Sequence, residues 1–347
     1  MEEQEQNAPP PRPPMPPRAR YSVGLTYNIK KNVKTDPPDA EAEYDDIGTV
    51  MSIKGALEES GCAVTLFEAD GRLTERLLAG RPDIVFNIAE GSAGRGREAQ
   101  VPAILSYFGI PFAGSDETAM CVTLIKSLAK TILSAHKIRT PKFKVFMPGE
   151  PVTAKGLPFP AFVKPDAEGS GKGITALSVA RNARELRSAV TAAAEIYKQN
   201  ILAEAFVEGR EFTVGLLGNG GETRVFEPME IVFKAGSSNI YSYEVKQNFR
   251  DYVEYKCPPD ISGEMSDGIK SAALSIYDIL ECRDFARIDF RMDRNGALFF
   301  IEINPLPGLA PGYSDYPMLA QFNGVGYNEL IRAMLNAALA RYGMRKI

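Results

Sequence analysis

The sequence predicts a parallel α/β domain in its N-terminal part, followed by two α+β lobes. Short apolar runs alternate with helical segments between residues 21 and 114, which is typical of βαβ units. Beyond the helix around Lys126, apolar runs come in pairs that flank a glycine-rich stretch, which indicates mainly antiparallel pairing. Further along, Asn295-Gly296 separates two runs of alternating apolar and polar residues and predicts a tight hairpin.

Composition limits the class of protein. The chain has 347 residues, enough for two or three packed units, and 44% of them are hydrophobic, so global disorder is not expected. A pI of about 5.4 gives no basic field, and no run approaches ~18 apolar residues, so we expect neither nucleic acid nor a membrane as a partner. The four cysteines show no CxxC spacing, which favours a reducing cytoplasm.

The chain divides into a tail and three units. Residues 1–20 contain seven prolines and no apolar stretch of a signal peptide, so we expect a disordered tail, with an SH3-type ligand as the alternative. The expected folded units are a doubly wound domain at 21–120, a central lobe with a glycine-rich loop at 121–220, and a C-terminal lobe with the hairpin at 221–347.

The individual elements follow from the same patterns. The first domain is expected to hold four strands and two helices: strands at 21–27, 63–67, 83–88 and 111–114, helices at 47–60 and 98–108. The next segments are expected to be two helices and four strands: helices at 116–135 and 182–197, strands at 159–164, 173–178, 201–206 and 211–217.

A single histidine restricts the chemistry. His136 lies at or just past the end of the expected helix 116–135, with no nucleophile motif nearby, and we interpret it as a surface or helix-end residue. Ser-His-Asp hydrolysis, multi-histidine metal sites and the HRD loop of protein kinases therefore have little support.

The segment from Arg287 to Asn304 carries the strongest functional signal. A two-residue turn at Asn295-Gly296 predicts that Asp289 faces Glu302 and Arg287 faces Asn304. The opposite face would be apolar, with these six residues: Ile288, Phe290, Met292, Phe299, Ile301 and Ile303. Two facing carboxylates destabilise a strand pair by about 0.2 to 1 kcal/mol, so a compensating partner is expected.

Two partners for these carboxylates are open. A divalent cation such as Mg²⁺ would bind Asp289, Glu302 and the amide of Asn304, which leaves Arg287 close to a developing negative charge. Alternatively, the face is a polar surface on which Arg287 pairs with one carboxylate. The rigid turn that ends at Gly308 directly follows Asn304 and favours the metal site.

A lysine precedes the glycine-rich loop. Lys164 ends an expected strand, and the loop that follows contains Gly169, Gly171 and Gly173, which allow backbone N–H groups to approach an anion. The spacing is not that of a Walker A loop. The loop predicts a phosphate site, and a merely mobile connection is the alternative.

This ordered set of motifs resembles the ATP-grasp superfamily, and within it the D-alanyl-D-alanine ligase family. The motifs are Lys164 with the glycine-rich loop, Leu202 to Val207 with Glu211, and the hairpin carrying Asp289, Glu302 and Asn304. The similarity extends from about residue 21 to about residue 340. It implies an N-terminal Rossmann-like (pre-ATP-grasp) domain and two α+β lobes that enclose ATP.

The resemblance also implies roles for individual residues. It places the following residues at ATP: Lys126, Lys164, Glu168, Gly169, Ser170, Glu204, Ala205, Phe206, Val207, Glu211 and Lys246. Asp289, Glu302 and Asn304 would hold two Mg²⁺ ions, with Mn²⁺ as an alternative. Arg287, Ser170 and the Gly308 backbone would act in catalysis. Glu43 (or Glu41), together with Arg287, Gly308 and Ser314, would bind substrate.

The implied reaction is ATP- and magnesium-dependent ligation through an acyl phosphate that an amine captures. The expected partners are small amino-acid substrates, and the resemblance suggests a homodimer. Departures at the substrate end, such as Asn87-Ile-Ala-Glu-Gly91 in place of a His-Gly pair, leave D-alanine itself in doubt. Alternatives are a secondary-metabolism ligase with a non-peptidic acceptor, as in mycosporine-like amino acid assembly, a non-catalytic ATP-binding regulator, and a simple kinase.

Overall fold

The computed structural model describes residues 19–31, 39–174, 178–234, 245 and 248–347. Most of the proline-rich tail and the predicted ATP contact Lys246 lie outside the described residues. Three sheets organise the described part of the chain, one parallel and two antiparallel. This confirms the predicted combination of an α/β domain with α+β lobes.

The first sheet is parallel and has the strand order β2-β1-β3-β4. Its strands are β1 Tyr21–Tyr27, β2 Cys62–Glu68, β3 Ile84–Ile88 and β4 Phe112–Ala113. Its helices are α1 Ile47–Glu59, α2 Leu73–Gly80 and α3 Gln100–Tyr107, the last preceded by the 3₁₀ turn η1 Arg97–Ala99. All four predicted strands are present, and α2 is the one helix here that the sequence patterns did not reveal.

The predicted helix 116–135 is wrong as a single element. Two helices replace it, α4 Glu117–Leu124 and α5 Lys126–Ala135, and their axes meet at 98°. Ile125 between them is extended, and the carboxylate of Asp166 accepts hydrogen bonds from Ser127 N and Oγ at 2.8 and 2.6 Å. Because the carboxylate of Asp166, from a distant segment, caps its first turn, α5 begins as a separate helix at Lys126.

No single helix within the described ranges has the length and apolarity needed to cross a membrane. The bent pair of α4 and α5 passes that test only when its two halves are taken together.

The second sheet has the order β5-β8-β6-β7, and all of its pairs are antiparallel. Its strands and helix are β5 Phe143–Phe146, β6 Ala161–Pro165, β7 Val179–Ala180, β8 Ile201–Ala205 and α6 Ala183–Tyr197. The predicted strand 173–178 is wrong in its described part. Turn hydrogen bonds from Lys172 N to Gly169 O and from Ile174 N to Gly171 O keep the chain coiled there, and pairing with β6 starts only at Val179.

The third sheet has the order β12-β11-β9-β13-β14, with β10 paired to β9. Its strands are β9 Gly209–Leu217, β10 Arg224–Val225, β11 Met229–Phe233, β12 Val253–Lys256, β13 Phe285–Asp293 and β14 Leu298–Asn304. The helices that accompany it are η3 Gly220–Glu222, α8 Phe249–Tyr252, α9 Gly263–Ile279, α10 Asp315–Phe322 and α11 Tyr327–Arg341. The expected division at residue 220 therefore cuts off β9, which pairs with β13 along its whole length.

The β13–β14 hairpin differs from the prediction in two ways that cancel. Gly296 N donates to Asp293 O at 3.0 Å and Gly296 has φ +79°, so the loop has three residues instead of two. A bulge between Asp289 and Phe290 then restores the register, and Asp289 faces Glu302 as predicted. The bulge reverses the alternation of side chains on β14.

As a result, the predicted apolar face is wrong for Phe299 and Ile301. Phe300 is buried in the core instead, packed with residues of β9 and α9.

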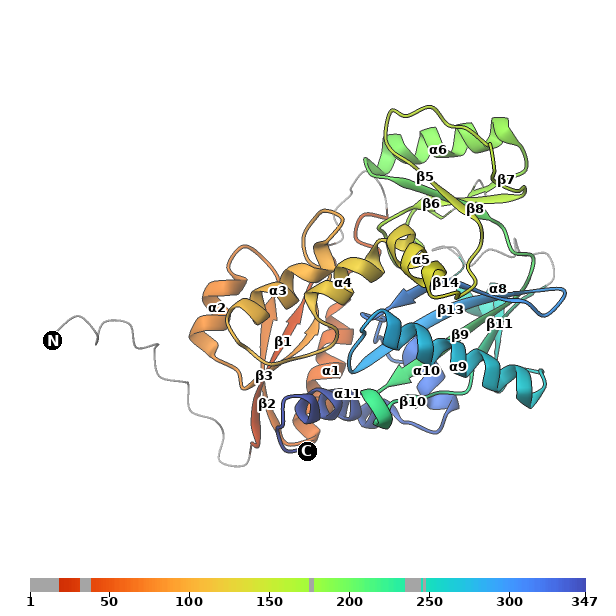
Figure 1. The fold of residues 1–347 in the computed structure, drawn as a ribbon. Helices are drawn as coiled ribbons and strands as arrows, with labels where there is room; N and C mark the ends of the chain where they lie inside the picture. Colours follow the sequence, from red (N-terminus) through yellow and green to blue (C-terminus); the bar gives the residue numbers. More distant parts are fainter. Residues whose placement is uncertain (1–18, 32–38, 175–177, 235–244, 246–247) are drawn as a thin grey trace.

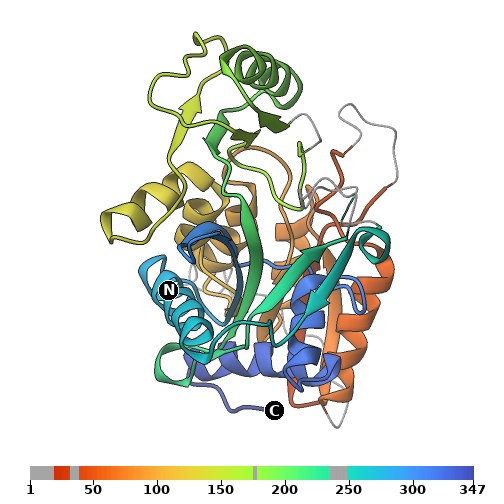
Figure 2. The same ribbon diagram turned by 90° about the vertical axis from the view of Figure 1, so that its right-hand side faces the viewer.

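The three sheets surround one junction. In Figure 1 the second sheet with α6 stands above the third sheet, and the first sheet lies beside it. Helices α1 and α11 pack against each other, and Figure 2 shows the dark blue α11 across the base of the molecule. The loop before α1, the glycine-rich loop and the open end of the β13–β14 hairpin meet where the three sheets converge.

Candidate active site

The facing ends of β13 and β14 carry a connected polar group. Arg287 Nε and Nη2 donate to Asp289 Oδ1 and Oδ2 at 3.0 and 2.8 Å, so this pair is bidentate. Thr213 Oγ1 donates to the same carboxylate at 2.7 Å, and Asn304 Nδ2 lies 3.4 Å from Asp289 Oδ2. The ion pair of Arg287 with Asp289, which the sequence analysis gave as the alternative to a metal site, is present. Burial alone would lower the pKa of Arg287, but Asp289 and Asp315 raise it, so the guanidinium stays charged.

The predicted metal ligands also lie together. Asp289 and Glu302 both line a cleft on the side of the hairpin that faces the second sheet, and Asn304 lies at the hairpin end, facing a second cavity. Two carboxylates and an amide oxygen form the donor set that Mg²⁺ prefers. The residues present therefore fit a divalent cation.

Lys126 approaches this group from the first turn of α5. Its Nζ donates to the backbone oxygen of Glu168 and lies 3.6 Å from Glu302 Oε2. The break at Ile125 and the cap by Asp166 set this position. The side chain is buried and lines the second cavity, next to Glu302, which lines the first cleft.

A buried ion network lies behind the first cleft. Glu204 Oε1 pairs with Lys164 Nζ and Glu204 Oε2 with Lys130 Nζ, each at 2.8 Å. Burial lowers the pKa of Lys130 to about 8, although Glu204 opposes that shift. Burial also opposes the charge on Lys164, but Glu204 and Glu302 together outweigh this effect, and the pKa of Lys164 is raised. Lys130 was not anticipated from the sequence.

The first cleft is lined by several of the residues that the sequence analysis placed at ATP. Its lining includes Lys164 from β6, the expected hinge Glu204 to Val207, and Glu211 from β9. Phe162 and Phe206 stack with ring centroids 6.1 Å apart. Arg291, which sequence reasoning missed, lies 4.8 Å over the Phe206 ring and 3.4 Å from Glu211.

The glycine-rich loop divides between two cavities. Gly171 and Ile174 line the first cleft, whereas Glu168, Gly169 and Ser170 line the second cavity, on the other side of the hairpin end. The predicted ATP contacts at these three residues are therefore placed beside the second cavity.

The second cavity brings together most of the predicted substrate residues. Glu43, Arg287, Gly308 and Ser314 all line it, while Glu41 is not among the lining residues and accepts from Lys31 N at 3.2 Å. A Cβ at Gly308 would lie 2.8 Å from Ser314 Oγ, so a larger residue there would displace the Ser314 side chain. Lys246 lies outside the described residues and is not placed.

Glu43 has protein partners in this cavity. Its Oε1 accepts hydrogen bonds from Arg97 Nη2 and from Gly169 N. Arg97 also donates to Ala167 O at 2.7 Å and lies 3.4 Å from Glu168. Sequence reasoning missed Arg97 and the adjacent Glu98. Both residues follow Gly91, Gly94 and Gly96 in the segment beyond the carboxyl end of the buried parallel strand β3. This position was the available signal, because ligands bind at the carboxyl ends of parallel strands.

Comparison with known proteins gives one consistent result. A family model described as D-ala D-ala ligase C-terminus matches residues 133–336. The uncharacterized protein y4sG of Sinorhizobium fredii is 33% identical over 299 residues, which cover 84% of this chain and 87% of that protein.

Two relatives have named activities. The D-alanine–D-alanine ligase of Aquifex aeolicus is 33% identical over 290 residues, covering 83% of this chain and 93% of its own. That of Cupriavidus pinatubonensis is 30% identical over 331 residues, covering 94% of each chain. A solved structure of the D-alanine–D-alanine ligase from Bacillus anthracis complexed with ATP superposes with a TM-score of 0.74 at 20% identity, covering 93% of this chain and 99% of that one.

Proposed function

Because this chain belongs to the D-alanine–D-alanine ligase family and has its ATP-grasp fold, we propose that it is an ATP- and magnesium-dependent carboxylate–amine ligase. It would join an amino acid to another amino acid or small acceptor through an acyl phosphate. The observation that carries the proposal is the hairpin end, where Arg287, Asp289, Glu302 and Asn304 lie at the wall between two cavities. One cavity suits the nucleotide and the other suits the acids that react.

ATP would occupy the cleft between the second and third sheets. The adenine would lie against Phe206 and the backbone of Glu204 to Val207, and Glu211 would meet the ribose. Lys164 would contact the phosphates while Glu204 holds its ammonium in place. Lys126 reaches the same region from α5, next to Glu302.

Divalent cations would be held by Asp289, Glu302 and Asn304, and when bound they would offset the charge of the phosphates. Arg287 would meanwhile keep Asp289 oriented through its bidentate ion pair. The lysines at the cleft neutralise charge from the opposite side. The oxygen donors that can hold cations and the buried lysines Lys126 and Lys164 together support an anionic, polyphosphate ligand.

The reaction itself would run across the hairpin end. A carboxylate oxygen of the first substrate bonds to the γ-phosphorus as the bond to the β–γ bridging oxygen breaks, which releases ADP. The amine of the second substrate then bonds to the acyl carbon, the acyl–oxygen bond breaks, phosphate leaves, and the amine proton passes to solvent. Arg287 and the backbone N–H of Gly308 line the cavity where the oxyanion would form, and hydrogen bonds to such a charge typically contribute about 100- to 1,000-fold.

The test is product analysis. Purified protein with ATP, Mg²⁺ and a mixed pool of amino acids and small amines would be analysed by mass spectrometry and for ADP release. We expect a new amide-linked conjugate formed in step with ADP. ATP binding without consumption under every supply of acid and amine would instead identify a non-catalytic nucleotide-binding protein, and a stable phosphorylated product would identify a kinase.

A further inference from the structure

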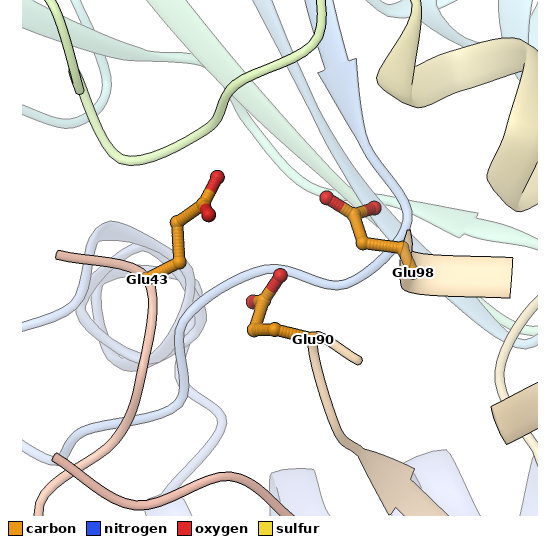
Figure 3. A group of neighbouring side chains, drawn as sticks. All are labelled: Glu43, Glu90 and Glu98. Atoms are coloured by element: carbon orange, nitrogen blue, oxygen red, sulfur yellow. The ribbon is translucent and has the colours of Figure 1, made fainter. Parts of the chain in front are cut away.

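Three carboxylates converge at one end of the second cavity. Figure 3 shows Glu43 from the loop before α1, Glu90 from the loop after β3 and Glu98 from η1 with their oxygens pointing toward a shared space. One oxygen from each lies within 4.8 Å of the others. All three residues line the cavity that contains Arg287 and Ser314 at its other end.

The three carboxylates differ in their partners. Glu43 is neutralised, because Arg97 and the Gly169 amide both bind its Oε1. Glu98 is only 8% exposed, yet within the described residues its carboxylate accepts no hydrogen bond, and its nearest cation, Arg97 Nη2, is 4.0 Å away. Glu90 likewise has no hydrogen bond or ion pair among the described residues.

Nearby cations are already used elsewhere. Lys172 pairs with Glu168 at 2.8 Å, Lys30 with Asp46 at 3.9 Å, and Lys126 with Glu302 at 3.6 Å. Glu98 is buried and Glu90 is half-buried, and a carboxylate that lacks a hydrogen-bond donor in such a place carries a desolvation penalty. A cationic group that enters the cavity would relieve this penalty, so the lack of donors at Glu98 favours a cationic ligand in addition to the convergence of the three groups.

The character of the cavity identifies the ligand. It is the cavity in which the proposed function places the acid substrate, with Arg287 at the end suited to a carboxylate. A free amino acid brings one ammonium, which offsets one carboxylate and leaves the other in excess. An additional ammonium or guanidinium on the same molecule would balance both. The Arg97 guanidinium, 4.0 Å from Glu98, opposes a divalent ion more strongly than a monovalent group.

We propose that Glu90 and Glu98 form a subsite for the cationic groups of a diamino or otherwise basic amino acid, which is the first substrate of this enzyme. The proposal rests on the ligase function and goes beyond it, because it assigns the substrate class. Glu43, held by Arg97 and Gly169, forms the wall of the subsite and positions the glycine-rich loop.

The experiment compares ligands that differ by one charge. Lysine and norleucine have nearly the same length, but norleucine lacks the terminal ammonium; 2,4-diaminobutyrate and norvaline form a shorter pair. Binding of both enantiomers of each is measured by calorimetry in the presence of Mg²⁺ and a non-hydrolysable ATP analogue. We expect the diamino acid to bind about 10- to 100-fold more tightly than its neutral partner, the usual scale for a charged hydrogen bond.

Variants then locate the effect. Glu90→Gln and Glu98→Gln should each remove most of this preference while leaving the affinity for the ATP analogue unchanged. Glu195→Gln, on the exposed face of α6, serves as the matched control and should retain the preference.

The outcomes separate this inference from the ligase function. Equal or tighter binding of the neutral amino acid by the wild type, or a preference that survives in both variants, overturns the subsite while ATP-dependent conjugation still stands. Binding of Mg²⁺ or Ca²⁺ without nucleotide that is lost in Glu98→Gln would assign the cluster to a metal ion and also overturn it. If no conjugate forms with any acid, the ligase proposal fails, and the binding comparison still decides whether the subsite exists.

Discussion

The carboxylate of Asp39 accepts a hydrogen bond from the backbone amide of Gly173, with Oδ2 and N 2.8 Å apart. The same oxygen accepts from Tyr197 OH at 2.8 Å. Together with the contact between Glu43 and Gly169 N, these bonds fasten the loop before α1 to both ends of the glycine-rich loop. The glycine-rich loop is thereby held against the first domain beside the second cavity, which Glu43 and Gly169 line.

Asp39→Ala should loosen this closure. The amides of Gly173 and Gly169 would exchange hydrogen faster, and the KM for the acid substrate would rise by several fold because the cavity is less completely formed. Stability should fall by about 1 to 3 kcal/mol, because two hydrogen bonds to one carboxylate are lost. Hydrogen exchange followed by mass spectrometry and steady-state kinetics measure these effects.

Asp278→Ala is the matched control for Asp39→Ala, because Asp278 is exposed on α9, away from the site. Exchange in the glycine-rich loop that is identical in Asp39→Ala and wild type would show that this contact does not hold the loop.

Glu302→Gln should abolish turnover without unfolding the protein. Glutamine keeps the shape of the side chain but removes the charge that faces Asp289 and lies 3.6 Å from Lys126. We expect ADP release to fall by at least about 100- to 1,000-fold, the scale for losing one electrostatic element of an active site. Thermal melting should remain close to that of the wild type.

The exposed Glu264 at the start of α9 gives the control variant Glu264→Gln for this measurement. Near-normal turnover in Glu302→Gln would contradict the assignment of Glu302 to the metal site.

The buried network around Glu204 predicts two very different stability changes. Glu204→Gln leaves Lys130 and Lys164 buried without their anion, and breaking such a pair typically costs about 3 to 5 kcal/mol. Lys130→Met leaves the pair of Glu204 and Lys164 intact, so its loss of unfolding free energy should be clearly smaller. Urea denaturation of both variants measures the difference, and an equal loss in both would show that the network does not act as a unit.

Local patterns predicted the elements and the facing carboxylates well. Alternation of apolar runs found all four strands of the first sheet, and asparagine–glycine placed the hairpin. The pairing of Asp289 with Glu302 was right although the turn length was wrong, because the bulge beside Asp289 offset the third loop residue. Periodicity cannot reveal a bulge, since the extra residue is set by packing against neighbouring strands.

Features that depend on distant parts of the chain could not be predicted in this way. The 98° break between α4 and α5 arises from the cap that Asp166 provides, and Asp166 is remote in sequence. Arg97 reaches Glu43 only because the loop after β3 folds back. A Cβ at Gly91 would lie 2.1 Å from Arg97 O, so this close approach needs glycine.

Glu98 gives a prediction for pH dependence. Burial raises its pKa to about 7, an effect that Arg97 and Lys126 oppose and that Glu43 and Glu168 reinforce, and the pKa of Glu90 beside it is raised as well. Below pH 7 Glu98 is protonated and cannot pair with an ammonium group. The affinity for lysine should therefore decrease as pH falls from 8 to 5.5, by up to about tenfold per pH unit well below 7, while the affinity for norleucine changes much less. Calorimetry across this range tests it. The dependence should flatten in Glu98→Gln, and a slope that persists there would assign the titration to another group.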